Sequence, residues 1–211
     1  MKPSKKRWLL AAISVAVMLP FMYPYLTFDP DSSRVSIASV QVQYPALVLH
    51  IIFAFIAMVA GFVQFIGRIR GHRSRIHRIV GRVYVGSIFV SGLLVFVIVP
   101  YIETFTSAVS FLLLASLWLF TTWKGFRAAM QGKAGEHRVW MIRSFGITLV
   151  AVCARVIVPA LLLVYGVLHG FELPGGREGM IEDILRVNIW TALVLDVVIV
   201  EWVVLSKNRK I

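Results

Sequence analysis

Six long apolar stretches constrain the fold of this chain more than any other feature. A transmembrane helix needs about 20 consecutive apolar residues, because the hydrocarbon core of a bilayer is about 30 Å thick. Within lipid, only helices and closed barrels satisfy their own backbone hydrogen bonds. The sequence therefore predicts an all-α polytopic membrane protein with a single transmembrane domain over residues 1–211. We expect spans at residues 8–27, 44–66, 79–101, 107–123, 140–166 and 187–206.

The composition supports a membrane protein, since 59% of the residues are hydrophobic and only 15% are charged. The one cysteine, Cys153, lies inside an apolar run and excludes both a disulfide framework and a c-type haem attachment site. The first span follows the basic segment MKPSKKR, which resembles the start of a signal peptide. No small-residue cleavage site follows it, so we expect this span to be retained.

The basic residues lie mostly on one side of the predicted membrane. Of the 22 lysines and arginines, 18 lie at alternate ends of the spans, on the side of both termini. The positive-inside rule therefore predicts a multi-pass membrane protein with both termini in the cytoplasm. The net charge of +12 is explained by topology and by attraction to anionic lipid headgroups of the phospholipid bilayer. We expect no nucleic-acid partner.

Small and polar residues recur every three or four positions in the second, third and fifth spans. Such lines mark the faces on which membrane helices pack together, so spans two to five are predicted to form a four-helix core. Small residues beside a histidine could also leave room for a flat macrocycle. The lines run through His50, Ala54, Ala57, Gly61, Gln64 and Arg68; through His77, Gly81, Tyr84, Ile88 and Ser91; and through His137, Met141, Ser144, Thr148, Ala151 and Arg155.

The depths of the three histidines limit the cofactor sites that they could form. His50 lies about 27 Å from Arg68 along its helix, in the outer half of the membrane, whereas His77 and His137 open their spans at the inner surface. A cofactor would therefore use His77 with His137, or His50 separately. Alternatively, His77 and His137 bind lipid phosphates or cap helix carbonyls, because each is followed by an arginine.

Three charged residues are predicted to lie within the membrane, where an unpaired charge is costly. Arg155 is about 18 Å deeper than Arg143, and Asp196 lies near the middle of the last span. We expect an ion pair between Arg155 and Asp196, and we expect Glu201 to pair with an arginine at the inner rim. Alternatively, Arg155 faces an anionic group of a ligand beside His50.

Several blocks of the sequence resemble a family of bacterial integral membrane proteins catalogued only as a domain of unknown function. The resemblance covers roughly residues 45–165 and leaves the first and last spans as additions. It is carried by residues 49–65 (LHIIFAFIAMVAGFVQF), 77–85 (HRIVGRVYV), 118–123 (WLFTTW), 137–144 (HRVWMIRS) and 150–155 (VAVCAR).

The chain is also distantly similar to four-helix b-type cytochromes, in which histidines on neighbouring helices ligate haem. This resemblance implies haem b between His77 and His137. A complete pair of haems is not expected, because the fourth span has no histidine to meet His50. The alternatives are one inner haem, or an outer haem that His50 binds with an unusual partner. The residues implied to neutralise haem propionates or an anionic donor are Arg78, Arg82, Arg138 and Arg143.

Two functions follow as expectations. The first is a membrane redox protein that binds haem b and moves electrons between a quinone or soluble redox partner and an acceptor, with His50, Arg155 and Asp196 as an outer site. The second is a non-enzymatic lipid-binding, scaffold or transport component without a cofactor. The sequence contains no H-E-x-x-H zinc motif, G-x-S-x-G elbow or phosphate-binding P-loop.

Overall fold

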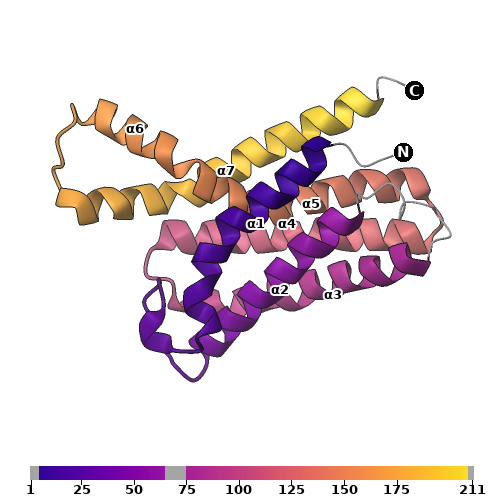
Figure 1. Cartoon of the computed structure of the whole chain (residues 1–211), viewed down its shortest axis with the longest axis horizontal. Coiled ribbons are helices and arrows are strands. Elements are labelled where there is room, and N and C mark those ends of the chain that lie inside the picture. Colours follow the sequence, from indigo (N-terminus) through magenta and orange to yellow (C-terminus); the bar gives the residue numbers. More distant parts are fainter. Residues whose placement is uncertain (1–4, 65–74, 209–211) are drawn as a thin grey trace.

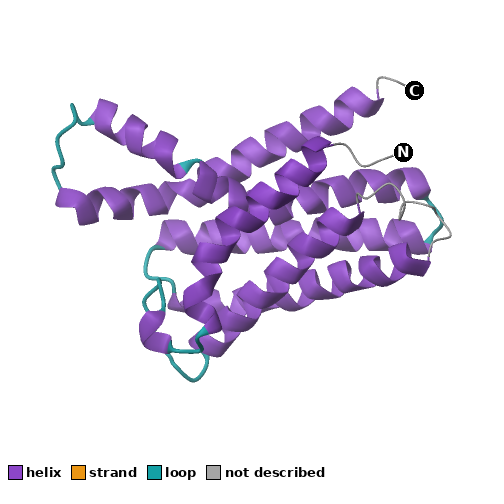
Figure 2. Ribbon diagram, viewed as in Figure 1, coloured by secondary structure: helices purple, strands orange, loops and turns teal. Residues whose placement is uncertain are grey.

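The computed structural model describes residues 5–64 and 75–208 of the chain, and over these ranges its only regular secondary structure is helix, joined by loops and turns (Figure 2). Six of its helices are long and apolar enough to cross a membrane, which confirms the predicted fold class. The helices are α1 (Lys5–Leu26), α2 (Gln43–Gln64), α3 (Arg75–Ile98), α4 (Phe105–Met130), α5 (Ala134–Val156), α6 (Val158–Leu168) and α7 (Gly176–Asn208), with 3₁₀ turns at Pro30–Ser32 and Val99–Tyr101.

Helices α2 to α5 form the predicted four-helix core. Each packs against the next along the chain, and α2 also contacts α5, which closes the bundle. Large buried side chains fill its centre, among them Tyr84, Ile88, Trp118 and Phe145. The start of α1, the end of α7 and the turn between α4 and α5 lie at one end of this bundle, which we call the basic end (Figure 1).

Helix α7 packs along α5 and belongs to the same core. Val150 and Ala154 of α5 form a buried cluster with Ala192 and Leu193 of α7. The two helices approach each other at Gly146, where an added Cβ atom would lie 2.3 Å from Val200. Small residues permit such close approach between helices in membranes. The last span is thus an integral part of the packing.

The predicted fifth span, residues 140–166, is interrupted at Ile157. Helix α5 ends at Val156 and α6 begins at Val158, because Pro159 has no N–H to donate to the carbonyl of Arg155. Helix α6 then contacts the beginning of α7. These two segments form a hairpin that projects beyond the bundle at the end opposite the basic end (Figure 1).

The structure also shifts other predicted boundaries. Helix α7 begins at Gly176, eleven residues before the predicted start of the last span, and α4 continues to Met130, beyond the predicted end at residue 123. The predicted end of the second span at residue 66, together with Arg68, lies outside the described residues.

Candidate functional site

Three arginines of α3 line a concavity at the basic end. Arg75, Arg78 and Arg82 are spaced by three and four residues, so they share one face of the helix. With Ile79 they border an open concavity of about 270 Å³. All three side chains are exposed, and none pairs with a carboxylate within the described part of the chain. The concavity therefore presents uncompensated positive charge to a ligand.

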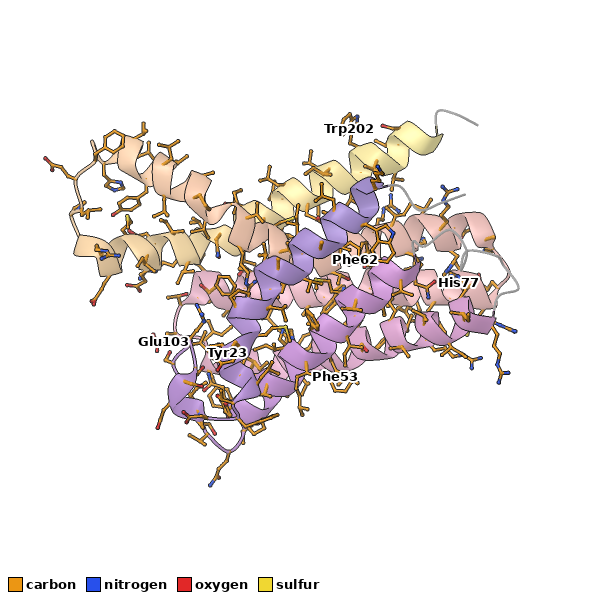
Figure 3. All side chains as sticks on the ribbon, viewed as in Figure 1. Tyr23, Phe53, Phe62, His77, Glu103 and Trp202 are labelled. Carbon is orange, nitrogen blue, oxygen red and sulfur yellow. The ribbon has the colours of Figure 1, made fainter. Side chains whose placement is uncertain are left out.

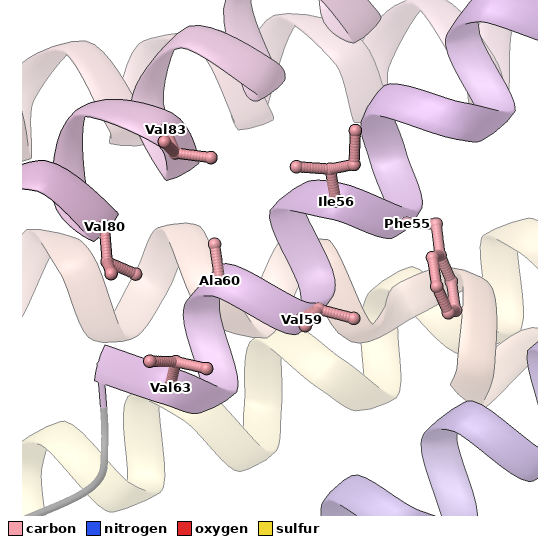
Figure 4. A pocket seen from close by; sticks show the side chains of 7 residues that line it. All are labelled: Phe55, Ile56, Val59, Ala60, Val63, Val80 and Val83. Atoms are coloured by element: carbon pink, nitrogen blue, oxygen red, sulfur yellow. The ribbon is translucent and has the colours of Figure 1, made fainter.

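An apolar groove between α2 and α3 lies beside this concavity (Figure 4). The volume of the groove is about 360 Å³. On α3, Val80 and Val83 of the groove each follow a residue of the arginine concavity, Ile79 and Arg82 respectively. One stretch of α3 thus carries cationic side chains on one face and apolar side chains on the neighbouring face. The groove is lined by Phe55, Ile56, Val59, Ala60, Val63, Val80 and Val83.

The structure places His77 and His137 at the basic end, on α3 and α5. Figure 3 shows His77 there, and its backbone carbonyl accepts a hydrogen bond of 3.0 Å from Gln64 Nε2. His137 Nδ1 lies 2.8 Å from the carbonyl oxygen of Gly125 in α4, which accepts its proton. Exposed Arg138 follows His137 on α5. His137 thus reaches its neighbouring helix through Nδ1.

Side chains of α5 fill the spaces that the glycines open near these histidines. An added Cβ atom at Gly61 would lie 2.3 Å from the Phe145 ring, and one at Gly125 would lie 2.7 Å from Met141 Sδ. Gly61 lies on one of the lines whose small residues could, from the sequence, either pack closely or leave room for a macrocycle. Both glycines accept bulky neighbours, because the bundle is stabilised by close packing.

A buried hydrogen-bond network crosses the bundle seven residues beyond each of these histidines. Tyr84 Oη lies 2.8 Å from Ser144 Oγ and 3.1 Å from Thr148 Oγ1. Trp118 Nε1 donates to Thr148 at 2.9 Å, and Thr122 contacts Ser144 at 2.7 Å. The sequence placed Tyr84, Ser144 and Thr148 on inward lines, but sequence spacing alone did not show that they meet.

His50 lies between α2 and α3 and forms hydrogen bonds with Ser91 of α3. Ser91 Oγ donates to the His50 carbonyl at 3.0 Å, so its single proton is used there. The His50 Nδ1–H is therefore the donor to Ser91, whose carbonyl and hydroxyl oxygens lie 3.0 and 2.9 Å away. These contacts give His50 a role in helix packing, separate from the basic end.

Arg143 and Glu201 form a bidentate ion pair between α5 and α7. Arg143 Nε lies 2.6 Å from Glu201 Oε1, and Nη2 lies 2.9 Å from Oε2. The guanidinium also lies 4.8 Å from the centre of the Trp140 ring. This finding confirms that Glu201 pairs with a rim arginine. Arg143 is one of the four arginines that the cytochrome resemblance implies to neutralise haem propionates or an anionic donor. In the structure its guanidinium already binds a carboxylate.

The predicted ion pair between Arg155 and Asp196 is wrong. Asp196 faces Gly146, at which an added Cβ atom would lie 3.0 Å from Asp196 Oδ2. Gly146 and Arg155 are nine residues apart, or about 13 Å along α5. Asp196 Oδ2 has no hydrogen-bond partner among the described residues. The antiparallel register of α5 and α7, anchored where Arg143 meets Glu201, therefore separates the two charges.

Arg155 turns toward α1. Its Nη1 donates to the Ala151 carbonyl at 2.7 Å, and its guanidinium carbon lies 4.6 Å from the centre of the Phe21 ring. The expected outer site of His50, Arg155 and Asp196 is not assembled, because these residues contact Ser91, Phe21 and Gly146 respectively.

A family model described as "Predicted membrane protein (DUF2306)" matches residues 47–204. The match extends from α2 through most of α7, so the last span is not an addition to the family's region as the resemblance had suggested. No match is found among curated proteins or among solved structures. Because the matched region covers most of the chain and coincides with the helical bundle, this protein belongs to the DUF2306 family of predicted membrane proteins.

Proposed function

We propose that this protein is a non-enzymatic membrane protein that binds anionic phospholipid headgroups at its basic end. In this proposal the basic end faces the cytoplasmic leaflet of a bacterial inner membrane. The observation that carries it is the concavity formed by Arg75, Arg78 and Arg82, in which no described carboxylate balances three guanidinium groups.

The chemistry of these side chains suits a phosphate ligand. A guanidinium donates two parallel hydrogen bonds to phosphate oxygens, and these charge-assisted bonds are stronger than neutral ones. Each basic residue near an anionic membrane surface contributes about 1 kcal/mol of attraction. Arg82 lies about 10 Å along α3 from Arg75. An arginine at this position can reach the headgroups, because its long stem lies favourably against apolar surface while its charged end remains in a polar environment.

The adjacent groove supplies a place for the rest of a lipid molecule. A headgroup held by Arg78 and Arg82 would leave an acyl chain beside Val80 and Val83, at the mouth of the groove between α2 and α3. The wholly apolar lining favours a hydrocarbon occupant. Together the two features support recognition of an intact phospholipid in preference to a free phosphate ion.

The test is a lipid titration of purified protein in zwitterionic detergent, with phosphatidylglycerol and phosphatidylcholine as probes. We expect preferential binding of phosphatidylglycerol, lost by about tenfold or more when Arg75, Arg78 and Arg82 are all replaced by glutamine. The matched control replaces Lys5, Arg127 and Lys133 by glutamine. These substitutions remove the same charge from the same end. Equal losses in both variants, or no headgroup preference in the unmodified protein, would contradict the proposal.

A second candidate function is redox chemistry with haem b and a quinone, and one observation favours it. The contact from His137 Nδ1 to the Gly125 carbonyl leaves Nε2 as the nitrogen that could bind a metal. The packing of Phe145 and Met141 against the glycines counts against a macrocycle at this place, because both side chains would have to move. The present packing at this place does not fit haem.

The redox candidate has a direct spectroscopic test. Protein purified from haem-replete cells would show a Soret band that disappears in both His77→Ala and His137→Ala. A spectrum without this band rejects the candidate, and a band retained in both variants would place the ligands elsewhere.

A further inference from the structure

Two arginines face one aromatic ring at the end of the molecule opposite the basic end. The guanidinium carbon of Arg155, on α5, lies 4.6 Å from the centre of the Phe21 ring. The corresponding carbon of Arg34, in the segment between α1 and α2, lies 4.9 Å from the same centre. Their separation therefore cannot exceed the sum of these two distances. Two positive charges therefore lie close together beside the end of α5.

The sequence of α1 explains how Arg34 is held there. Pro24 has no N–H, so the carbonyl of Pro20 lacks its usual partner four residues later in the helix. Arg34 Nη2 donates to this carbonyl at 3.1 Å. The backbone N–H of Arg34 also donates to Tyr25 Oη at 3.3 Å. The proline pair in α1 and Tyr25 thus fix the loop that carries Arg34.

No described carboxylate forms an ion pair with either arginine. Asp29, in the same connecting segment as Arg34, accepts a hydrogen bond from the Asp31 N–H at 3.1 Å and caps the 3₁₀ turn that follows it. Arg155 Nε is buried and has no hydrogen-bond partner among the described residues. Like charges held close together repel each other. The two arginines therefore have an unfavourable interaction that no described ion pair balances.

A buried hydroxyl lies in the same neighbourhood. Tyr44 is 6% exposed, and its Oη atom has no hydrogen-bond partner among the described residues. Tyr44 packs in one cluster with Tyr25. Tyr25 Oη in turn accepts a hydrogen bond from the backbone N–H of Arg34, which links this cluster to the arginines. An unpaired buried hydroxyl costs free energy, and it can donate a hydrogen bond to an anion.

We propose that Arg34, Arg155, Tyr25 and Tyr44, arranged around Phe21, form an oxyanion-binding site, which we call the α1/α5 site. Its ligand carries a phosphate or carboxylate group that accepts hydrogen bonds from the two guanidiniums and from Tyr44. Such a group supplies the missing negative charge and the missing acceptor together. The site is independent of the arginine concavity, because it uses other helices at the other end of the molecule.

The oxyanion can come from a lipid or from solution, and the probes separate these sources. Thermal unfolding of the full chain is followed in zwitterionic detergent with phosphatidylglycerol, inorganic phosphate or acetate. Phosphatidylcholine, which is zwitterionic and has no net charge, is the comparison. A ligand that binds only the folded state raises the unfolding temperature, and the rise grows with the ratio of the ligand concentration to its Kd. A shift with phosphatidylglycerol alone identifies a lipid headgroup, and a shift with phosphate or acetate identifies a soluble anion.

Variants assign the effect to this site. Arg34→Gln and Arg155→Gln should each weaken binding of the active probe by about tenfold or more, the loss of one charge-assisted hydrogen bond. Arg186→Gln is the matched control, since it removes an arginine from the same end that pairs with Glu182 and Asp183. Binding through Arg75, Arg78 and Arg82 is distinguished by repeating the titration in the protein with those three arginines replaced by glutamine, where the effect should persist.

Tyr44→Phe keeps the test valid if an arginine variant fails to fold. It removes only a hydroxyl that has no partner, so the unliganded protein should unfold at the same temperature or higher. The affinity for the anion should nevertheless fall. The proposal is overturned if none of the charged probes shifts the unfolding temperature, or if Tyr44→Phe and the arginine variants bind the active probe as tightly as Arg186→Gln does.

Discussion

Arg143 and Glu201 join α5 to α7 through two hydrogen bonds, from Nε to Oε1 at 2.6 Å and from Nη2 to Oε2 at 2.9 Å. The pair lies five residues beyond Asp196 along α7, so it sets the register that keeps Asp196 opposite Gly146. One contact between two charged side chains thus helps to determine which intramembrane charges can meet.

Breaking this pair should destabilise the contact between α5 and α7. Because the Glu201 side chain is 38% exposed, we expect Glu201→Gln to lower the free energy of unfolding by only about 1 kcal/mol. Unfolding in detergent by heat or denaturant measures the effect. Glu182→Gln on the same helix, which breaks an exposed pair with Arg186, is the control and should have a smaller effect. Exchanging the two charges in Arg143→Glu/Glu201→Arg should restore part of the stability that Arg143→Glu or Glu201→Arg loses alone. A double variant less stable than both of these single variants would argue against a direct pair.

Asp196 should tolerate loss of its charge. It is 6% exposed and makes no ion pair within the described residues, so Asp196→Asn removes a charge without breaking a salt bridge. An unpaired charge within the membrane is costly, so we expect unchanged or slightly higher stability. The same unfolding assay measures this, with Glu201→Gln beside it. A loss as large as that of Glu201→Gln would reveal a partner for the carboxylate that the structure does not show.

Removing the Tyr84 hydroxyl should weaken the buried network. Tyr84 is 1% exposed, and Tyr84→Phe leaves Thr148 and Ser144 without one of their hydrogen-bond partners. The expected loss is about 1–3 kcal/mol in the free energy of unfolding. Tyr23, which is 70% exposed, provides the control Tyr23→Phe. Equal stability of the two variants would mean that the network contributes no net stability.

The close approach of α5 to α2 depends on a glycine. A Cβ atom at Gly61 would lie 2.3 Å from the Phe145 ring, so Gly61→Ala should cost about 1–3 kcal/mol. At Gly86 an added Cβ meets nothing within 4 Å, so Gly86→Ala should be neutral or stabilising by up to about 1 kcal/mol. Thermal unfolding of both variants compares them directly. Phe145→Leu should relieve part of the Gly61→Ala defect, and an unrelieved defect would show that the crowding lies elsewhere.

The sequence predicted which faces many of these residues occupy, but it did not predict which residues meet. The spacing of Ser144 and Thr148 correctly placed both on an inward face, because residues three or four apart share one side of a helix. The partner that bridges them, Tyr84, comes from a helix 60 residues away in sequence. Likewise, Arg34 could not be linked to Arg155 by any local pattern, since their shared ring belongs to α1. Long-range partners depend on which helices are neighbours.

The sequence by itself determined the helical class, the six spans and the concentration of basic residues at one end. These properties are local, because hydropathy over about 20 residues and the position of charges along the chain govern membrane insertion. Tertiary structure alone decided that Glu201 meets Arg143, that Asp196 faces Gly146, and that Arg155 turns to Phe21. The physical reason is the register between packed helices: a shift of one turn, about 5.4 Å, is invisible to hydropathy and exchanges every partner across an interface.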